Sequence, residues 1–206
     1  MVFYQNLAKD PLSADFLLRA EAARASIPDP VWQGLQRAGW RVKLVEFVTD
    51  AVPHLRHTRP RGWPLPYTWN HTDALSLPAS RTLVLAEKRL RPNGEIIYSE
   101  RVAGVFRHEL GHAFDLMAGR PFGLRSATPD FAAAYRRDVA GMAGSLRRSV
   151  AYYLQPKPAG PQEAFAEAFA IALGGGSDVT KRQDIVDAFP EVLAFVKQDI
   201  ERCGRP

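Results

Sequence analysis

The chain of 206 residues has few cysteines, no long apolar run and no recognisable signal peptide. A single cysteine, Cys203, excludes an internal disulfide and a cysteine-rich zinc site. No stretch reaches the ~18 apolar residues of a membrane-spanning helix, and the N-terminus lacks the basic start and apolar run of a signal peptide. We therefore expect a soluble protein that is cytoplasmic or exported by a route without a classical signal.

The sequence also lacks a large excess of either positive or negative charge. The 27 Lys and Arg residues and 22 Asp and Glu residues give a net charge of +5, and no run of like charges resembles a nucleic-acid-binding tail. Hydrophobic residues make up 46% of the chain and charged residues 24%, as in soluble globular proteins. The composition favours one globular domain that has no nucleic acid as its main partner.

Histidine is scarce, with five in the chain, yet two of them stand four positions apart in residues 108–112, His-Glu-Leu-Gly-His. Side chains four apart share one face of an α-helix, so His108 and His112 can both reach one Zn²⁺ at about 2.0–2.1 Å. Glu109 leaves the helix at a different angle, where it can act as the general base of a metalloprotease. The competing interpretation is a chance match on an ordinary buried helix.

The surroundings of this motif predict that it lies within a helix. Apolar residues recur at helical spacing through residues 101–118, no proline interrupts them, and Gly119 followed by Pro121 is a stop signal. The other predicted elements are helices at 12–25 with Ser13 as its cap, 31–38, 129–142, part of 144–153, 162–173, 178–188 with Asp178 as its cap, and 190–201, and strands at 40–48, 82–87 and 95–98.

Two regions before the motif are candidates for the edge of a binding cleft. Residues 53–80 carry five prolines with aromatic residues between them, so we expect an irregular, packed segment at the rim of the cleft. Its histidines have no partner at metal-ligand spacing and are expected to be surface or packing residues (His54, His57, His71). An Asn-Gly turn signal at 93–94 predicts a hairpin, which either offers an edge strand to an extended peptide or only packs on the sheet.

A catalytic zinc needs a third protein ligand. One known arrangement places a histidine six residues after His112, but Ala118 stands there. Glu163 and Glu167 lie four apart on an otherwise apolar helix, and a metal and a histidine would remove the cost of burying them; the alternative is two solvated glutamates. We assign Glu163 to the metal and Glu167 to a hydrogen bond with a ligand imidazole, with the reverse left open. Asp115 is either another such partner or a surface residue.

The two motifs together resemble a known family. His-Glu-Leu-Gly-His-Ala-Phe-Asp, followed much later by Glu-Ala-Phe-Ala-Glu-Ala-Phe, is similar to the catalytic domain of anthrax lethal factor and to the related Pro-Pro endopeptidases. The resemblance implies a single α+β domain over residues 1–206 with a zincin-like fold, in which 1–27 are an N-terminal helical extension and 28–203 are the metallopeptidase core. It implies a small twisted mixed sheet, an active-site helix and a mainly helical C-terminal part.

The same resemblance implies an activity. It implies one Zn²⁺ per chain bound by His108, His112 and Glu163, with Glu109 as general base. We therefore expect a zinc-dependent metalloendopeptidase that acts on a peptide or protein substrate, and the likeness to Pro-Pro endopeptidases points to proline near the cut. The sequence leaves the oligomeric state open, with a monomer as the expectation.

The sequence departs from this family at one position. The family carries a tyrosine that stabilises the oxyanion seven residues before the glutamate ligand, and Pro156 stands there. Tyr153 and Tyr152, ten and eleven residues before Glu163, are the replacements; we prefer Tyr153, and either is alternatively a packed aromatic. The displaced tyrosine motivates an alternative function, a catalytically inactive zinc-binding or interaction module derived from a zincin fold.

Overall fold

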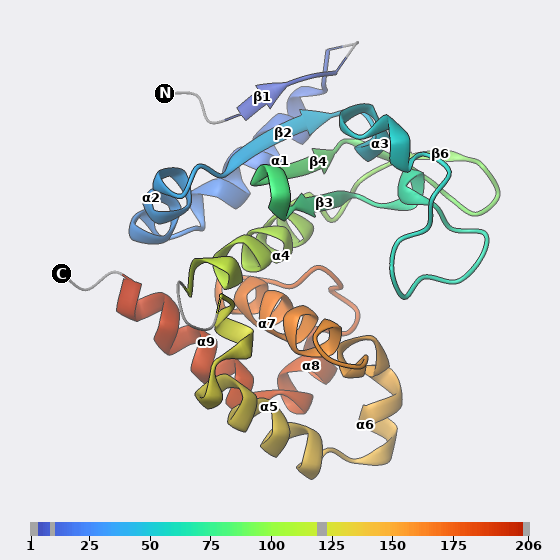
Figure 1. Cartoon of the computed structure of the whole chain (residues 1–206). Coiled ribbons are helices and arrows are strands. Elements are labelled where there is room, and N and C mark those ends of the chain that lie inside the picture. The colour runs from blue at the N-terminus through green and yellow to red at the C-terminus, as the bar shows by residue number, and fades with distance from the viewer. Residues whose placement is uncertain (1–3, 9–10, 119–122, 204–206) are drawn as a thin grey trace.

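The protein has the mixed architecture that its sequence predicts. In the computed structural model, which describes residues 4–8, 11–118 and 123–203, a small sheet lies on one side of helix α4 (Val102–Asp115) and a group of helices lies on the other (Figure 1). The α+β class, with a small mixed sheet and a mainly helical C-terminal part, is confirmed. Within these ranges, no helix combines the length and apolarity that spanning a membrane requires.

The sheet has the strand order β1-β2-β4-β3. β1 (Tyr4–Asn6) and β4 (Thr82–Ala86) run parallel to β2 (Arg41–Val45), whereas β3 (Ala74–Leu77) pairs antiparallel with β4 at the edge of the sheet. Sequence analysis missed β1 and β3, and β3 lies in the segment 53–80 for which it predicts irregular structure. β1 has three residues and β3 has four, too few to show an alternation of apolar and polar residues. Pairing with a neighbouring strand therefore decides their conformation.

The predicted Asn93-Gly94 turn forms, and the strand predicted at 95–98 is present, but its hairpin partner is not the strand predicted at 82–87. β5 (Lys88–Leu90) pairs antiparallel with β6 (Ile96–Tyr98), and the N–H of Gly94 donates to the carbonyl of Arg91. The expected partner, β4, is already paired on both sides by β2 and β3. The hairpin therefore forms a separate two-stranded sheet.

The predicted helices form with shifted ends. Their bounds are α1 (Ala14–Ala25), α2 (Asp29–Arg37), α5 (Pro129–Gly141), α6 (Gly144–Ser149), α7 (Ala159–Ala172), α8 (Arg182–Ala188) and α9 (Pro190–Cys203). Ser13 caps α1 as predicted, with its Oγ accepting the N–H of Phe16. The predicted cap of α8 is wrong, because Asp178 instead accepts hydrogen bonds from the N–H and hydroxyl of Thr180, and the helix begins after Lys181.

Two boundaries differ for local reasons. The strand predicted at 40–48 stops at Val45, because a further helix, α3 (Val48–Ala51), begins where the carboxylate of Asp50 accepts the N–H of Phe47. Helix α4 continues as a 3₁₀ turn over 116–118. The predicted stop signal at 119–121 lies outside the described residues.

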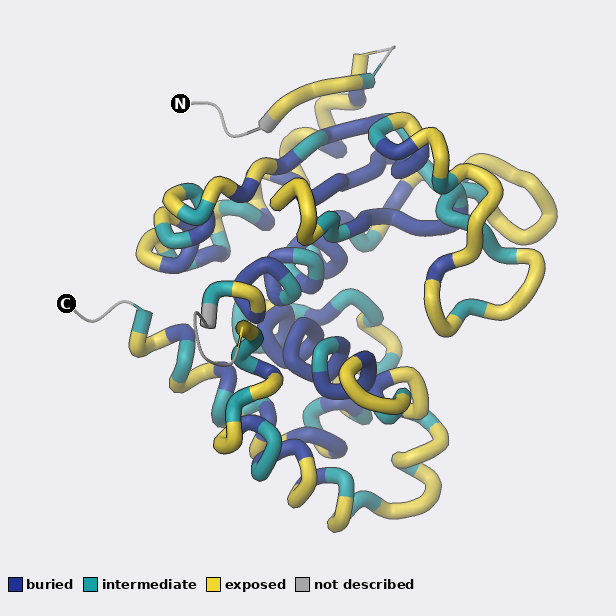
Figure 2. Tube along the Cα trace, viewed as in Figure 1, coloured by how far each residue is buried: buried dark blue, intermediate teal, exposed yellow. Residues whose placement is uncertain are grey.

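The main hydrophobic core surrounds α4 and α7 (Figure 2). One face of the sheet contributes Val42, Leu44, Leu83 and Leu85 to it, and α1 covers α4 through Phe16, Ala20 and Ala23. A smaller cluster of Val45, Val48, Val52, Leu75, Val84 and Ala86 lies on the opposite sheet face. The sheet, α1 and α7 therefore all pack against α4.

Gly111 sets how closely α4 approaches α7. A Cβ atom at Gly111 would lie 2.7 Å from the Cα of Ala166 and 2.8 Å from its carbonyl oxygen. These are backbone atoms, which cannot move aside as a flexible side chain would. The glycine of the His-Glu-Leu-Gly-His motif therefore permits the contact that brings the two glutamates of α7 beside the two histidines of α4.

Replacing Gly111 by alanine should destabilise the fold. Overpacking a tight core contact typically costs about 1–3 kcal/mol, more than the roughly 0.5–1 kcal/mol that alanine gains over glycine in a helix. We expect a lower free energy of unfolding in urea for Gly111→Ala. Gly141→Ala is the matched control, because a Cβ at that helical glycine meets no heavy atom within 4 Å. Equal stability of Gly111→Ala and the wild type would contradict the close-contact argument.

Candidate metal centre

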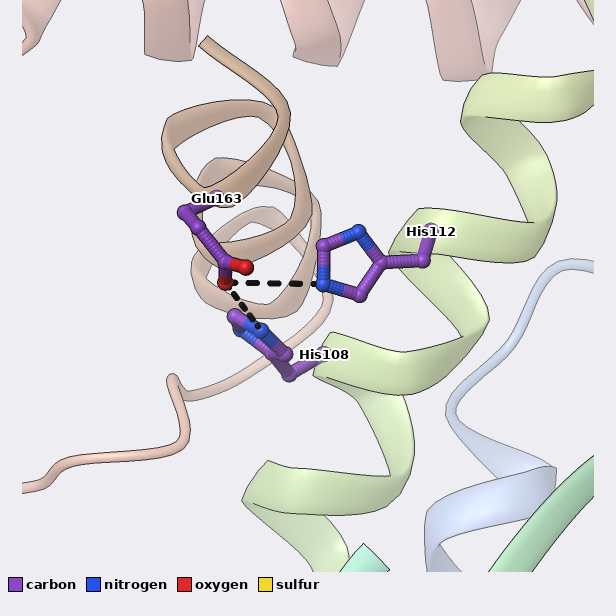
Figure 3. Close-up of side chains that lie close together, drawn as sticks. All are labelled: His108, His112 and Glu163. Carbon is purple, nitrogen blue, oxygen red and sulfur yellow. Dashed lines mark ion pairs between the residues drawn. The ribbon is translucent and has the colours of Figure 1, made fainter. Parts of the chain in front are cut away.

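Helices α4 and α7 bring three potential metal ligands together. The Nε2 atoms of His108 and His112 lie 3.3 Å and 3.5 Å from the same oxygen, Oε2 of Glu163. Figure 3 shows the two imidazoles projecting from α4 toward this carboxylate on α7. One potential ligand atom from each residue lies within 4.8 Å of the other two. Sequence spacing alone predicts the pair of histidines, and the packing of α7 against α4 adds the carboxylate.

The geometry of these atoms fits a small tetrahedral cation. Ligands placed about 2.0–2.2 Å from a tetrahedral Zn²⁺ are separated from one another by roughly 3.3–3.6 Å. The two imidazole-to-carboxylate distances, 3.3 Å and 3.5 Å, fall in this range. Two nitrogens and one carboxylate oxygen are also ligands that suit such an ion. The three side chains therefore fit a tetrahedral metal ion and leave its fourth coordination position for another ligand.

Glu167 lies behind His108, on the other side of the imidazole from Glu163. Its Oε2 is 2.7 Å from His108 Nδ1, and its side chain is fully buried. The backbone N–H of Ser177 donates to Oε1 at 2.8 Å, and the Ser177 hydroxyl donates to Oε2 at 2.6 Å. This arrangement directs the Nε2 of His108 toward Glu163, as a carboxylate partner does for a metal-bound histidine.

The electrostatics of the cluster favour a positive charge between its side chains. Burial alone would lower the pKa of His108, but hydrogen bonds and charges from Glu163 and Glu167 raise it well above its usual value. Burial would raise the pKa of Glu163, yet His108 and His112 hold it far below the usual range. The pKa of Glu167 is also lowered, because hydrogen bonds from His108 and Ser177 outweigh its burial. A bound cation would supply the charge that these carboxylates favour.

Glu109 lies in the same cleft but outside the three-residue cluster. Burial raises the pKa of Glu109, although the nearby charges of His112 and His108 oppose this shift. Hydrogen bonding by the backbone of Ser76, in strand β3, also acts to lower this pKa. Glu109 is therefore a better proton acceptor near neutral pH than an ordinary solvent-exposed glutamate.

The two candidate tyrosines occupy different surroundings in the 3₁₀ turn Ala151–Leu154. Tyr152 is 36% exposed, and burial together with the charges of Glu163 and Glu109 and a hydrogen bond to Glu163 raises its pKa. Tyr153 is only 5% exposed, and its ring packs edge-on against Phe189. Both tyrosines line the cleft, but Tyr152 is the more exposed of the two and the one whose pKa Glu163 raises through hydrogen bonding as well as charge.

Asp115 is hydrogen bonded to a serine and, in the part of the chain that the structure describes, not to an imidazole of the two histidines. Its two carboxylate oxygens accept the N–H and the hydroxyl of Ser126, each at 2.6 Å. Among the described residues, no hydrogen bond joins Asp115 to His108 or His112. The side chain is 1% exposed, so the alternative of a surface residue is wrong. Asp115 therefore attaches the segment around Ser126 to the C-terminal end of α4.

The cluster lies in a cleft of about 700 Å³. Edge strand β3 forms one wall with Leu75 and Ser76, whereas no residue of β5 or β6 lines it. Of the two alternatives for the hairpin, an edge strand at the cleft is wrong, and β3 lies there instead. The proline-rich segment contributes Pro60, Arg61, Trp63 and Trp69, which confirms it as a rim of the cleft. Sequence analysis missed Arg61, whose guanidinium lies 3.5 Å from Glu163, because nothing in its local pattern indicates a cleft residue.

Comparison with solved structures agrees with this architecture. The structure of the Pro-Pro endopeptidase PPEP-2 from Paenibacillus alvei superposes with a TM-score of 0.63, covering 95% of this chain and 96% of that chain. The chain shares the fold of a Pro-Pro endopeptidase. Sequence identity is 19%, so the comparison concerns the fold, and the fold predicted from the two motifs is confirmed. No protein-family model and no curated protein matches the sequence.

Changing Asp115 to asparagine should lower stability without affecting metal binding. The variant replaces a buried acceptor of two hydrogen bonds by a group with only one acceptor oxygen, which typically costs about 1–3 kcal/mol. The free energy of unfolding in urea measures this loss. Zinc binding by chelator competition should match the wild type, and weaker zinc binding in the folded variant would instead support Asp115 as a partner of a ligand histidine.

Proposed function

We propose that this protein is a zinc-dependent metalloendopeptidase. The observation that carries the proposal is the convergence of His108, His112 and Glu163 in a cleft that also contains Glu109. When bound, Zn²⁺ acts as a Lewis acid that polarises the scissile carbonyl and makes water a stronger nucleophile. One zinc per chain, held by Nε2 of both histidines and the Glu163 carboxylate, agrees with the separations of these atoms.

Glu109 is the general base in this proposal. It removes a proton from the attacking water and later delivers a proton to the leaving amine. Its raised pKa supports both steps, because a carboxylate with an increased proton affinity accepts the proton more readily and can still release it. Glu167 acts indirectly, by orienting His108 through its Nδ1.

The substrate is a peptide in extended conformation. Strand β3 lies at the edge of the sheet and lines the cleft, so its outer edge can pair with a peptide as an additional strand. Trp63 and Trp69 offer flat apolar surfaces at the rim. Because the structural neighbour is named a Pro-Pro endopeptidase, we propose proline residues next to the cleaved bond, with the tryptophans packing against their rings.

Tyr152, rather than Tyr153, donates a hydrogen bond to the oxyanion in this proposal. Tyr152 is the more exposed tyrosine and Glu163 raises its pKa, whereas the ring of Tyr153 is buried and packs against Phe189. This reverses the preference for Tyr153 that the sequence alone favours. Although no tyrosine stands at the family position, Tyr152 lines the same cleft as the cluster, which weakens the argument for an inactive module.

Paired substitutions test the metal centre and the base separately. Glu163→Ala removes a proposed ligand, so zinc should bind more weakly by at least about 100-fold, beyond the loss usual for a residue that only supports a ligand. Glu109→Gln should keep zinc and lower kcat/KM by about 10²–10⁴-fold. Zinc content and cleavage of a fluorogenic library of proline-containing peptides measure both effects. Wild-type turnover by Glu109→Gln would refute the mechanism, and zinc binding without any cleavage by the wild type would favour the inactive module.

The tyrosine assignment predicts unequal effects of two otherwise identical substitutions. Tyr152→Phe should lower kcat by about 10²–10³-fold, as the loss of one oxyanion donor does in other hydrolases. Tyr153→Phe keeps the buried ring and should change kcat by less than about 10-fold. Steady-state kinetics on one peptide substrate compare the pair directly. A larger loss for Tyr153→Phe would restore the assignment to Tyr153.

A further inference from the structure

The loop that follows α7 runs back along α4 and ends at the metal centre. Gly174 and Gly175 have positive φ values of +115° and +156°, which glycine adopts without strain. Arg107 of α4 donates through Nε to the carbonyl of Gly175 at 3.1 Å. Arg101, just before α4, lies 3.5 Å from the carbonyl of Ser177. Two residues of the loop, Gly175 and Ser177, are thus attached to the segment that carries the histidines.

The loop is in close contact with its neighbours at two glycines, Gly104 and Gly176. A Cβ at Gly104 of α4 would lie 2.1 Å from the carbonyl oxygen of Gly176, and a Cβ at Gly176 would lie 2.1 Å from Oε1 of Glu167. The backbone at Gly176 therefore fits between α4 and the Glu167 carboxylate. Because the backbone at Gly176 is in close contact with both α4 and Glu167, these two neighbours fix the position of the next residue, Ser177.

Ser177 directs both of its donors at Glu167. Its N–H and its hydroxyl bind the two different carboxylate oxygens, at 2.8 Å and 2.6 Å. The oxygen that accepts the hydroxyl, Oε2, also lies 2.7 Å from His108 Nδ1. Two donors on two oxygens hold both the position and the plane of a carboxylate, and this plane determines the direction in which the imidazole points.

We propose that Ser177 is a positioning residue of the metal centre, which acts through Glu167 to hold His108 with its Nε2 facing Glu163. The inference rests on the proposed function, because it concerns the zinc affinity of that same centre. Removal of the hydroxyl leaves the N–H to Oε1 as the only donor from Ser177, so Oε2 and the imidazole become free to reorient. Partners that support metal ligands typically contribute 10–100-fold to affinity, and we expect about 10-fold for Ser177.

The chain provides a matched control in Ser126. It binds the two oxygens of Asp115, also on α4, through its N–H and hydroxyl in the same way. Asp115 makes no hydrogen bond to a histidine within the described residues. Ser126→Ala therefore removes the same kind of hydrogen bond from a buried carboxylate, and has a similar cost in stability, without touching the proposed ligands.

The test compares zinc affinity by chelator competition in the full chain and its variants. Ser177→Ala and Ser177→Val, which both lose the hydroxyl, should bind zinc about 10-fold more weakly and shift the visible absorption bands of the Co²⁺-substituted protein. Ser177→Thr, which keeps the hydroxyl and has the shape of valine, should restore both properties. Ser126→Ala should leave the affinity within about 2-fold of the wild type. The 10-fold expectation follows the effect of ligand-supporting partners.

The outcomes separate this inference from the proposed function. If the wild type binds zinc and the folded Ser177→Ala and Ser177→Val proteins match it in affinity and Co²⁺ spectrum, the role of Ser177 is refuted and the metallopeptidase proposal stands. If Ser126→Ala weakens zinc equally, the effect is one of general stability and the inference also fails. If the wild type itself binds no zinc, both proposals fail together. Unfolding in urea identifies any variant that has lost its fold. In that case the zinc affinities of Ser177→Thr and Ser177→Val are compared, and equal affinities refute the role of the hydroxyl.

Discussion

The contact between α4 and α7 is the constraint on which the rest of the site depends. Neither helix holds a complete set of ligands, and the cluster forms only because Gly111 allows the backbone of Ala166 to approach closely. Once the helices are this close, Glu163 faces both histidines and Glu167 faces the back of one of them. The same contact that builds the hydrophobic core therefore builds the polar centre, so stability and site geometry are coupled.

Burying carboxylates beside an apolar core requires that each has partners, since an unpaired buried charge is costly. The protein meets this requirement in two ways. Glu163 and Glu167 use imidazoles, and Asp115 uses the N–H and hydroxyl of a serine. Glu167 combines both solutions, with His108 on one side and Ser177 on the other. This combination places the Gly-rich loop after α7 within a connected set of hydrogen bonds that ends at the proposed zinc.

The cleft is assembled from parts that differ in their distance along the chain from the motif. Glu109 and the histidines come from one helix, whereas the edge strand β3 and the tryptophan-containing segment precede it and Tyr152 follows it. The chain shares the fold of a Pro-Pro endopeptidase. In the proposed function, an extended peptide placed along β3 would pass the cluster between these walls.

The sequence by itself determined the features that follow from local helix geometry. Histidines four apart, glutamates four apart and the Ser13 cap need only the helical repeat, which holds wherever the helix packs. Tertiary structure alone decided β3, the surroundings of Tyr152 and the contact of Ser177 with Glu167. A four-residue strand acquires its conformation from β4, and a loop serine gains its function from a carboxylate ten residues away. Such features depend on which segments pack together, and no local periodicity records that.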